Sequence, residues 1–94
     1  MLGLARRAGS VVIGARAVSA AARRGRLAAV LVASDASERA VGRLVPEARD
    51  AARVRVGTRA TLGGALGRTE VAVAGITDRS LADRVLEEIR RQVP

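Results

Sequence analysis

The sequence predicts an α/β fold: a three-layer α/β/α sandwich with a central sheet of about four strands. Short β-branched or continuous apolar runs recur along the 94 residues, segments of good helix formers separate them, and glycines stand at several of the junctions. The elements follow in the order α-β-α-β-α-β-α-β-α. A chain of this length suits one modest core, so we expect residues 1–94 to form a single domain.

In the first third of the chain, glycines mark the ends of the predicted elements most clearly. Residues 2–8 predict a short helix that ends at Gly9, and the β-branched run 11–13 predicts a strand that Gly14 stops. Residues 15–24 are good helix formers closed by Gly25. Residues 28–33 form a continuous apolar run, which indicates a strand with both faces covered.

The middle of the chain begins with two capping signals. Ser34 and Asp35 predict the N-cap of a helix over 36–45, and Glu38 stands three residues after Asp35, as in a capping box. Residues 46–52 then either extend this helix as a second turn or form a loop. Alternating valine and arginine over 53–56 predict a short strand.

The last third predicts a helix, a strand and a helix. The helix runs from Thr58 to about Leu66, and the strand covers 71–76. Thr77 and Asp78 predict the cap of the last helix, where Leu81, Val85 and Ile89 recur at every fourth residue and Glu87 and Arg91 form a favourable pair four apart. We expect the glycines at 63, 64 and 67 to serve close helix packing, because they lack the lysine and the strand-to-helix position of a phosphate loop.

The composition excludes several classes of function. Without Cys and His, the usual soft and imidazole metal sites, disulfides and Cys- or His-based catalysis are impossible. Without Phe, Tyr and Trp, the chain cannot stack bases on aromatic rings. No apolar run has the length of a membrane span or of a signal peptide. We expect a soluble cytoplasmic protein with no catalytic residue, metal, cofactor or small-molecule substrate.

The charge is distributed unevenly. Residues 1–34 contain six arginines and no acidic side chain, whereas the rest of the chain has eleven arginines and all nine carboxylates. A GC-rich coding bias explains arginine in place of lysine, but it does not explain the missing Asp and Glu. Such an asymmetry predicts a polyanion as partner.

The arginines of the predicted helix 15–24 gather on one side. A turn of 100° per residue places Arg16, Ser19, Ala20, Arg23 and Arg24 on the outer face, and Ala15, Val18 and Ala22 opposite. Because Gly14 begins the helix without a side chain, the first backbone N–H groups are open to a phosphate or a base edge. A solvated face of an amphipathic helix would show the same pattern.

The segments LGLARRAGSVVIGARAVSAAARRGRLAAVLVASDAS, TLGGALGR and VAVAGITD, in this order, resemble the bacterial branch of the kink-turn-binding ribosomal-protein family, whose superfamily includes the archaeal L-seven-Ae and eukaryotic L-thirty-e proteins. The resemblance covers nearly the whole chain and implies the α/β/α sandwich. It also implies an RNA site made by the start of the second helix and the loop before the last strand, here 67–71.

The family's helix motif, Gly-x-Asn-Glu-x-x-Lys with a closing Arg-Gly, is matched only in part. Gly14, Arg24 and Gly25 agree, whereas Arg16, Ala17 and Ala20 stand at the Asn, Glu and Lys positions. Arginine can contact O6 and N7 of guanine bidentately, so Arg16 is expected to read a base. The candidate RNA-binding residues are Gly14, Ala15, Arg16, Ala17, Ser19, Ala20, Arg23, Arg24, Arg68 and Thr69, with Arg23 and Arg24 on phosphates.

The sequence therefore predicts a non-catalytic, monomeric protein that binds structured RNA, a kink-turn or ribosomal RNA, in association with the ribosome. Two alternatives stay open. One is a protein-interaction module that kept the fold, lost RNA recognition and uses its basic face for an acidic partner. The other is general nucleic-acid binding through charge alone.

Overall fold

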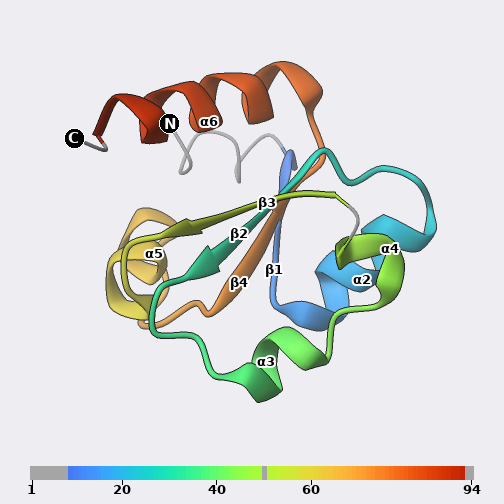
Figure 1. Cartoon of the computed structure of the whole chain (residues 1–94), viewed down its shortest axis with the longest axis horizontal. Coiled ribbons are helices and arrows are strands. Elements are labelled where there is room, and N and C mark those ends of the chain that lie inside the picture. Colours follow the sequence, from blue (N-terminus) through green and yellow to red (C-terminus); the bar gives the residue numbers. More distant parts are fainter. Residues whose placement is uncertain (1–8, 50, 93–94) are drawn as a thin grey trace.

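The computed structural model describes residues 9–49 and 51–92 and contains a four-stranded mixed sheet with helices on both faces (Figure 1). Its elements, in chain order, are β1 (Val11–Ile13), α2 (Ala15–Arg23), β2 (Ala29–Ala33), α3 (Glu38–Gly42), α4 (Pro46–Arg49), β3 (Ala52–Val56), α5 (Arg59–Ala65), β4 (Val73–Ile76) and α6 (Arg79–Gln92). The predicted four strands are confirmed. The helix predicted over 2–8 lies outside the described residues.

The strands are arranged in the order β1-β4-β2-β3. β2 and β3 are parallel, and β4 is antiparallel to both β1 and β2. All five residues of β2 are buried, which confirms the prediction that both its faces are covered. The last strand reaches the interior of the sheet between the first two, so it brings the segment before it next to the start of α2.

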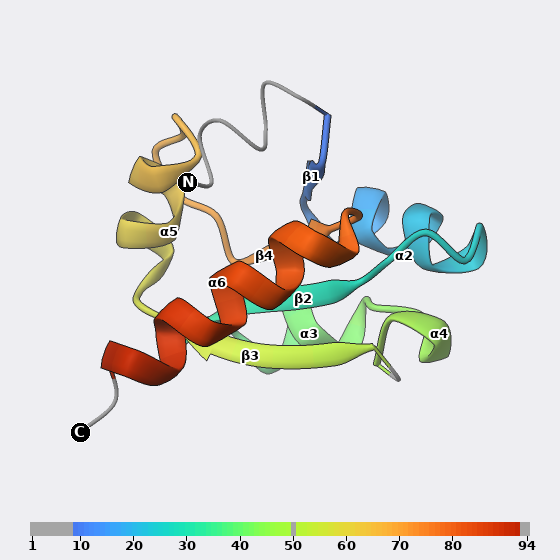
Figure 2. The ribbon, with the colours of Figure 1, turned by 90° about the horizontal axis from the view of Figure 1, so that it is seen from above.

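Side chains of β2 alternate between two cores, as the period of a strand requires. Val30 and Val32 pack with α2 and with the segment around Leu44 on one face. Leu31, between the two valines, packs with α5 and α6 on the other. The three layers are therefore α2, α3 and α4, then the sheet, then α5 and α6. In both ribbon views α5 lies at one end of the molecule and α2 with α4 at the other (Figures 1 and 2).

The predicted helix over 36–45 is wrong in its cap and its length. Ser37 is the N-cap of α3, because its hydroxyl accepts a hydrogen bond from the N–H of Ala40 (3.1 Å). Asp35 instead accepts from the N–H of Arg59 (2.8 Å), the first residue of α5. Glu38 begins α3 and completes no capping box with Asp35. The carboxylate of Asp35 thus binds the backbone of Arg59, which lies 24 positions further along the chain. Local capping rules consider only neighbouring residues and do not include such a tertiary contact.

The segment 46–52, for which two alternatives were open, divides between a helix and a strand. Pro46 begins the short helix α4, where its fixed φ suits the first helical position and its missing N–H costs nothing. Leu44 and Ala48 are buried against α2 and the sheet. After α3 ends, the segment 44–48 therefore packs against α2 instead of continuing the helix.

The glycines at 63 and 64 differ in their surroundings. A Cβ on Gly63 would lie 2.9 Å from backbone atoms of Thr69 and Glu70, whereas a Cβ on Gly64 would meet nothing within 4 Å. The expected close packing is thus real at Gly63, but the partner is the loop before β4 and not another helix. This loop replaces the first two residues of the strand predicted over 71–76.

The last helix begins as predicted, since Asp78 accepts a hydrogen bond from the N–H of Leu81 (3.0 Å). Ala82 and Val85, on the inner face of this helix, are buried. The side chains of Ile89 and Arg91 lie outside the described residues, so the pair of Glu87 with Arg91 stays a prediction. Within the described part of the chain, no helix is both long and apolar enough to cross a membrane.

Candidate functional site

The start of α2 depends on a backbone conformation at Gly14, its N-cap, that favours glycine. Gly14 has φ 94° and ψ 152°, a region that is open essentially to glycine alone. Its N–H donates to the carbonyl of Val73 in β4 (2.9 Å), and its carbonyl accepts the N–H of Val18 (3.0 Å). Among the described residues, the N–H groups of Ala15, Arg16 and Ala17 find no acceptor. The helix therefore presents open donors at its positive dipole end.

The outer face of α2 is narrower than its helical pattern predicts. Arg16 and Arg23 are exposed, and Ala17 and Ala20 are partly exposed between them. Ser19 is only 5% exposed, and its hydroxyl accepts a hydrogen bond from the N–H of Val45 (3.2 Å). The prediction that Ser19 lies on the outer face is therefore wrong. The sheet covers one side of α2, and the segment 44–48 covers a second side. A larger part of the helix circumference is therefore buried than the sequence pattern predicts.

The end of α2 is a Schellman motif. Gly25, with φ 69°, donates to the carbonyl of Ala22, and Arg26 donates to the carbonyl of Ala21, both at 3.0 Å. This tight turn holds three exposed arginines around one point, namely Arg23, Arg24 and Arg26. Arg26 was not among the candidate residues, because it lies beyond the helix motif and only its charge marks it.

The loop before β4 is fastened to α5. Arg68 donates its N–H to the carbonyl of Gly63 (2.7 Å), and Val71 donates to the carbonyl of Arg59 (3.0 Å). The side chains of Arg68, Thr69 and Glu70 are exposed. Backbone bonds at both ends hold these side chains on a fixed segment.

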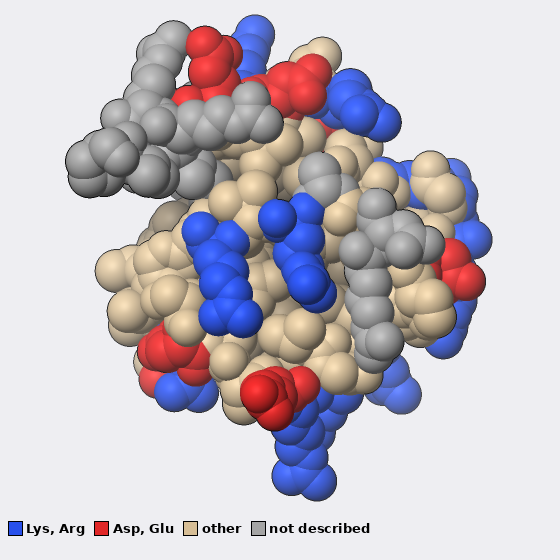
Figure 3. All heavy atoms as spheres, viewed as in Figure 1, with Lys and Arg blue, Asp and Glu red and all other residues tan. Residues whose placement is uncertain are grey.

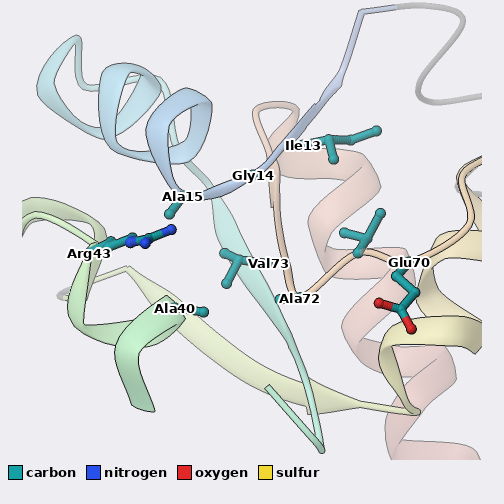
Figure 4. Close-up of a pocket in the computed structure, with 9 residues that line it drawn as sticks. Ile13, Gly14, Ala15, Ala40, Arg43, Glu70, Ala72 and Val73 are labelled. Atoms are coloured by element: carbon teal, nitrogen blue, oxygen red, sulfur yellow. The ribbon is translucent and has the colours of Figure 1, made fainter. Parts of the chain in front are cut away.

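A pocket of about 210 Å³ lies where the start of α2, the loop before β4 and α3 meet (Figure 4). It is lined by Ile13, Gly14, Ala15, Ala40, Arg43, Glu70, Val71, Ala72 and Val73. The two chain segments that the sequence proposed as one site thus meet here. The lining contains Gly14 and Ala15 but neither Arg16, Arg68 nor Thr69, and the loop contributes Glu70 instead.

Two residues of the pocket, Ala40 and Arg43, were missed by the sequence. They belong to α3 and the residue after it, whose course depends on Ser37 as the cap and on the burial of Leu44. A helix over 36–45 would have placed these side chains differently, so no sequence signal identified them.

The arginines of α2 have no carboxylate partner within the described structure. Asp35 instead pairs with Arg59 of α5, with 3.6 Å between Nε and Oδ2, and both side chains are almost half exposed. In the view of Figure 3, blue side chains lie over β3, where Arg53 and Arg55 are exposed, and the acidic side chains lie toward the margins. Unpaired guanidinium groups are available to an external anion.

Comparison with known proteins agrees with this architecture. The model of the ribosomal protein L7Ae/L30e/S12e/Gadd45 family matches residues 1–85. A solved structure of a protein of unknown function from Bacillus halodurans C is 30% identical, with a TM-score of 0.81, over 92% of this chain and 89% of that chain. The 15.5kD RNA binding protein of Giardia lamblia is 24% identical, with a TM-score of 0.74, over 98% of this chain and 80% of that chain. No significant match was found among curated proteins.

Proposed function

The chain belongs to the ribosomal protein L7Ae/L30e/S12e/Gadd45 family, and from this premise we propose that it binds structured RNA of the kink-turn type. The observation that carries the proposal is the meeting of the α2 start and the loop before β4 around one pocket. The similarity to an RNA-binding protein of the same fold adds support. We further propose that it acts as a non-catalytic monomer in the cytoplasm, in association with the ribosome.

Each part of the α2 surface has a distinct role in this proposal. The open N–H groups of the first turn receive a phosphate or a base edge. Arg16 contacts O6 and N7 of a guanine, which discriminates between bases by roughly 1–3 kcal/mol. Arg23, Arg24 and Arg26 hold phosphates at the other end of the helix and contribute affinity without sequence information. Ser19 is left out because its hydroxyl is buried and bonded to Val45.

The loop has a smaller role. Arg68 and Thr69 are exposed on the fastened segment before β4, where they can contact the RNA backbone beside the pocket. The side chains of Ala17 and Ala20 offer van der Waals contact and no hydrogen bond. Discrimination between RNA bases therefore depends more on Arg16 than it would if polar side chains stood at these two positions.

The proposal is tested by a salt-titrated binding assay. The probes are a kink-turn RNA and the same RNA with its tandem G·A pairs converted to Watson–Crick pairs. A preference of tenfold or more for the kink-turn, about 1.4 kcal/mol, supports the proposal. Equal binding that decays with salt in parallel contradicts it and indicates recognition of charge alone.

Two arginine variants separate base reading from phosphate binding. Arg16→Gln should reduce the preference for the kink-turn, whereas Arg24→Gln should weaken both RNAs alike and lower the salt slope by about 1. Arg84→Gln is the matched control, because Arg84 is exposed on α6 in the opposite layer. Equal losses on both RNAs for Arg16→Gln would exclude its base-reading role.

A second candidate function is a protein-interaction module for an acidic partner. The partly exposed Ala17 and Ala20 favour it, because a helix face without amide or carboxylate groups between its arginines suits charge contacts better than base reading. A pulldown that recovers protein and no nuclease-sensitive RNA supports this candidate.

A further inference from the structure

The edge of the sheet that β3 forms is open. The strand order places β3 at the end of the sheet opposite β1, and within the described part of the chain β3 pairs with β2 alone. Figure 2 shows β3 as the outer strand beside β2. Every second residue of such a strand points its backbone N–H and C=O groups away from the sheet. Hydrogen-bond donors and acceptors therefore alternate along this edge.

β3 has a charged side and an apolar side. Arg53 and Arg55 are exposed, whereas Val54 and Val56 are partly buried. The register pairs Arg53 with Val30 of β2, which packs with α2. Because successive residues of a strand point to opposite faces, Arg53 and Arg55 lie on the α2 side of the sheet. Val54 and Val56 lie on the other side, where Val56 packs against the core under α5 and α6.

The two arginines of β3 have donors to spare. Among the described residues, neither Arg53 nor Arg55 forms an ion pair. The Nη1 of Arg55 donates a long hydrogen bond to the carbonyl of Ser34 (3.5 Å). The next residue, Asp35, pairs with Arg59 instead. In the view of Figure 3, the blue side chains over β3 are surrounded mainly by uncharged surface. Because a guanidinium has five N–H donors, most of these donors are available to an external carboxylate or phosphate.

A second copy of β3 is a poor partner for this edge. In a symmetric antiparallel dimer, residues that lie opposite each other point to the same face of the joined sheet. The arginines of one copy would therefore lie opposite those of the other, and like charges directly opposite are destabilising. The edge thus disfavours self-association and favours a strand of opposite charge.

A nucleic acid would use only part of what the edge offers. Phosphate oxygens can accept hydrogen bonds from Arg53 and Arg55, but the outward carbonyl oxygens of β3 would find no donor there and would repel the phosphate charge. A peptide backbone carries one N–H and one C=O on each residue, so it matches both kinds of outward group. An added strand also has the same advance of about 3.3 Å per residue, which places its alternate side chains beside the two arginines.

We propose that the β3 edge binds an extended acidic peptide segment of a partner protein as an added strand of the sheet. Acidic residues at alternate positions pair with Arg53 and Arg55, and apolar residues between them lie on the side of Val54 and Val56. Main-chain hydrogen bonds supply the affinity, and the ion pairs select the sequence. Because β1 leads into α2 at the opposite end of the strand order, this surface is separate from the α2 site and does not depend on the proposed RNA-binding function.

The probe is a capped seven-residue peptide in which valine and glutamate alternate, titrated into the isotope-labelled full chain and followed by nuclear magnetic resonance. It should shift the amide signals of β3 and slow the hydrogen exchange of the outward N–H groups. Three control peptides should bind at least fivefold more weakly. One has lysine for each glutamate, one has the same composition with its glutamates contiguous, and one has proline for the central valine, which removes an N–H from the added strand.

Reversal of the charge on β3 tests the ion pairs. Arg53→Glu combined with Arg55→Glu should weaken the glutamate peptide by tenfold or more and make the lysine peptide the stronger ligand. An unfolded variant would bind neither peptide at this edge, so the exchange of preference distinguishes the ion pairs from a loss of structure. The matched control is Arg79→Glu combined with Arg84→Glu, the same change of charge at exposed positions of α6. This control should keep the preference of the wild type.

Three results would overturn the inference. The first is the absence of shifts in the β3 amides with the glutamate peptide. The second is equal binding of the alternating, contiguous and proline peptides without slower exchange, which indicates charge alone. The third is an oligouridine that shifts the same amides and displaces the peptide, which assigns the edge to RNA.

Binding of the kink-turn RNA separates this inference from the proposed function. At physiological ionic strength, where the Debye length is about 8 Å, the Arg53→Glu and Arg55→Glu double variant should bind this RNA within twofold of the wild type. A larger loss would assign the edge to the RNA interface and contradict the inference. If the wild type binds the peptide as expected but does not select the kink-turn, the inference stands and the proposed function fails.

Discussion

Gly63 and its neighbour Gly64 offer a matched test of the contact that positions the loop before β4. Both lie in α5, yet an added Cβ would meet backbone atoms at 2.9 Å at Gly63 and nothing within 4 Å at Gly64. Optimal separation between carbon atoms is roughly 3.5–4.0 Å. To make room for a Cβ on Gly63, the backbone of Thr69 and Glu70 would therefore have to move by about 0.6 Å or more. Hydrogen bonds on both sides of this segment oppose the movement.

The expected free energies have opposite signs. Alanine in place of glycine within a helix stabilises by roughly 0.5–1 kcal/mol, and this gain should appear in full for Gly64→Ala. Overpacking costs about 1–3 kcal/mol, so Gly63→Ala should lose about 0.5–2 kcal/mol net. In a domain of this size, 1 kcal/mol shifts the Tm by roughly 4–8 °C. The two variants should therefore melt at clearly different temperatures.

Urea denaturation followed by far-ultraviolet circular dichroism measures the difference. Intrinsic fluorescence is unsuitable because the chain has no Phe, Tyr or Trp. Equal stabilisation by both substitutions would refute the argument that the loop passes against Gly63. A loss at Gly63 accompanied by weaker RNA discrimination would further connect the loop position to the proposed site.

Three other substitutions test the local structure around the site. Gly14→Ala has room for its Cβ but should destabilise by about 1–3 kcal/mol through its positive φ, measured by thermal denaturation. Asp35→Ala should cost about 0.5–2 kcal/mol by removing the acceptor for the N–H of Arg59, whereas Asp35→Asn keeps an acceptor and should lose much less; equal losses would assign the effect to the ion pair. Ser19→Ala leaves the N–H of Val45 without its partner and should cost roughly 1 kcal/mol in urea denaturation, with unchanged RNA affinity; a loss of affinity without a loss of stability would restore Ser19 to the interface.

Elements with a strong local signal could be predicted from the sequence. The apolar run of β2, the glycines around α2 and the Asp78 cap of α6 each encode their own conformation within a few residues. Local sterics and backbone hydrogen bonding decide such segments, so neighbours in sequence suffice. The arginine face of α2 was predictable for the same reason, since its residues share one helix.

The segment 34–52 shows where local rules fail. Ser34, Asp35 and Ser37 can each cap a helix, and the choice depends on Arg59, which takes the carboxylate of Asp35 from a distant part of the chain. Ser19 likewise looked exposed until the segment after Leu44 passed beside it. In both cases a long-range contact decided the outcome against the local pattern.

By itself, the sequence determined the fold class, the four strands, the asymmetry of charge and the helix that carries the arginines. The tertiary structure alone decided that Arg43 and Glu70, from separate segments of the chain, line one pocket. The reason is physical: helix and strand periodicity are set by neighbouring residues, whereas a pocket forms where segments 27 residues apart are brought together by the order of strands in the sheet.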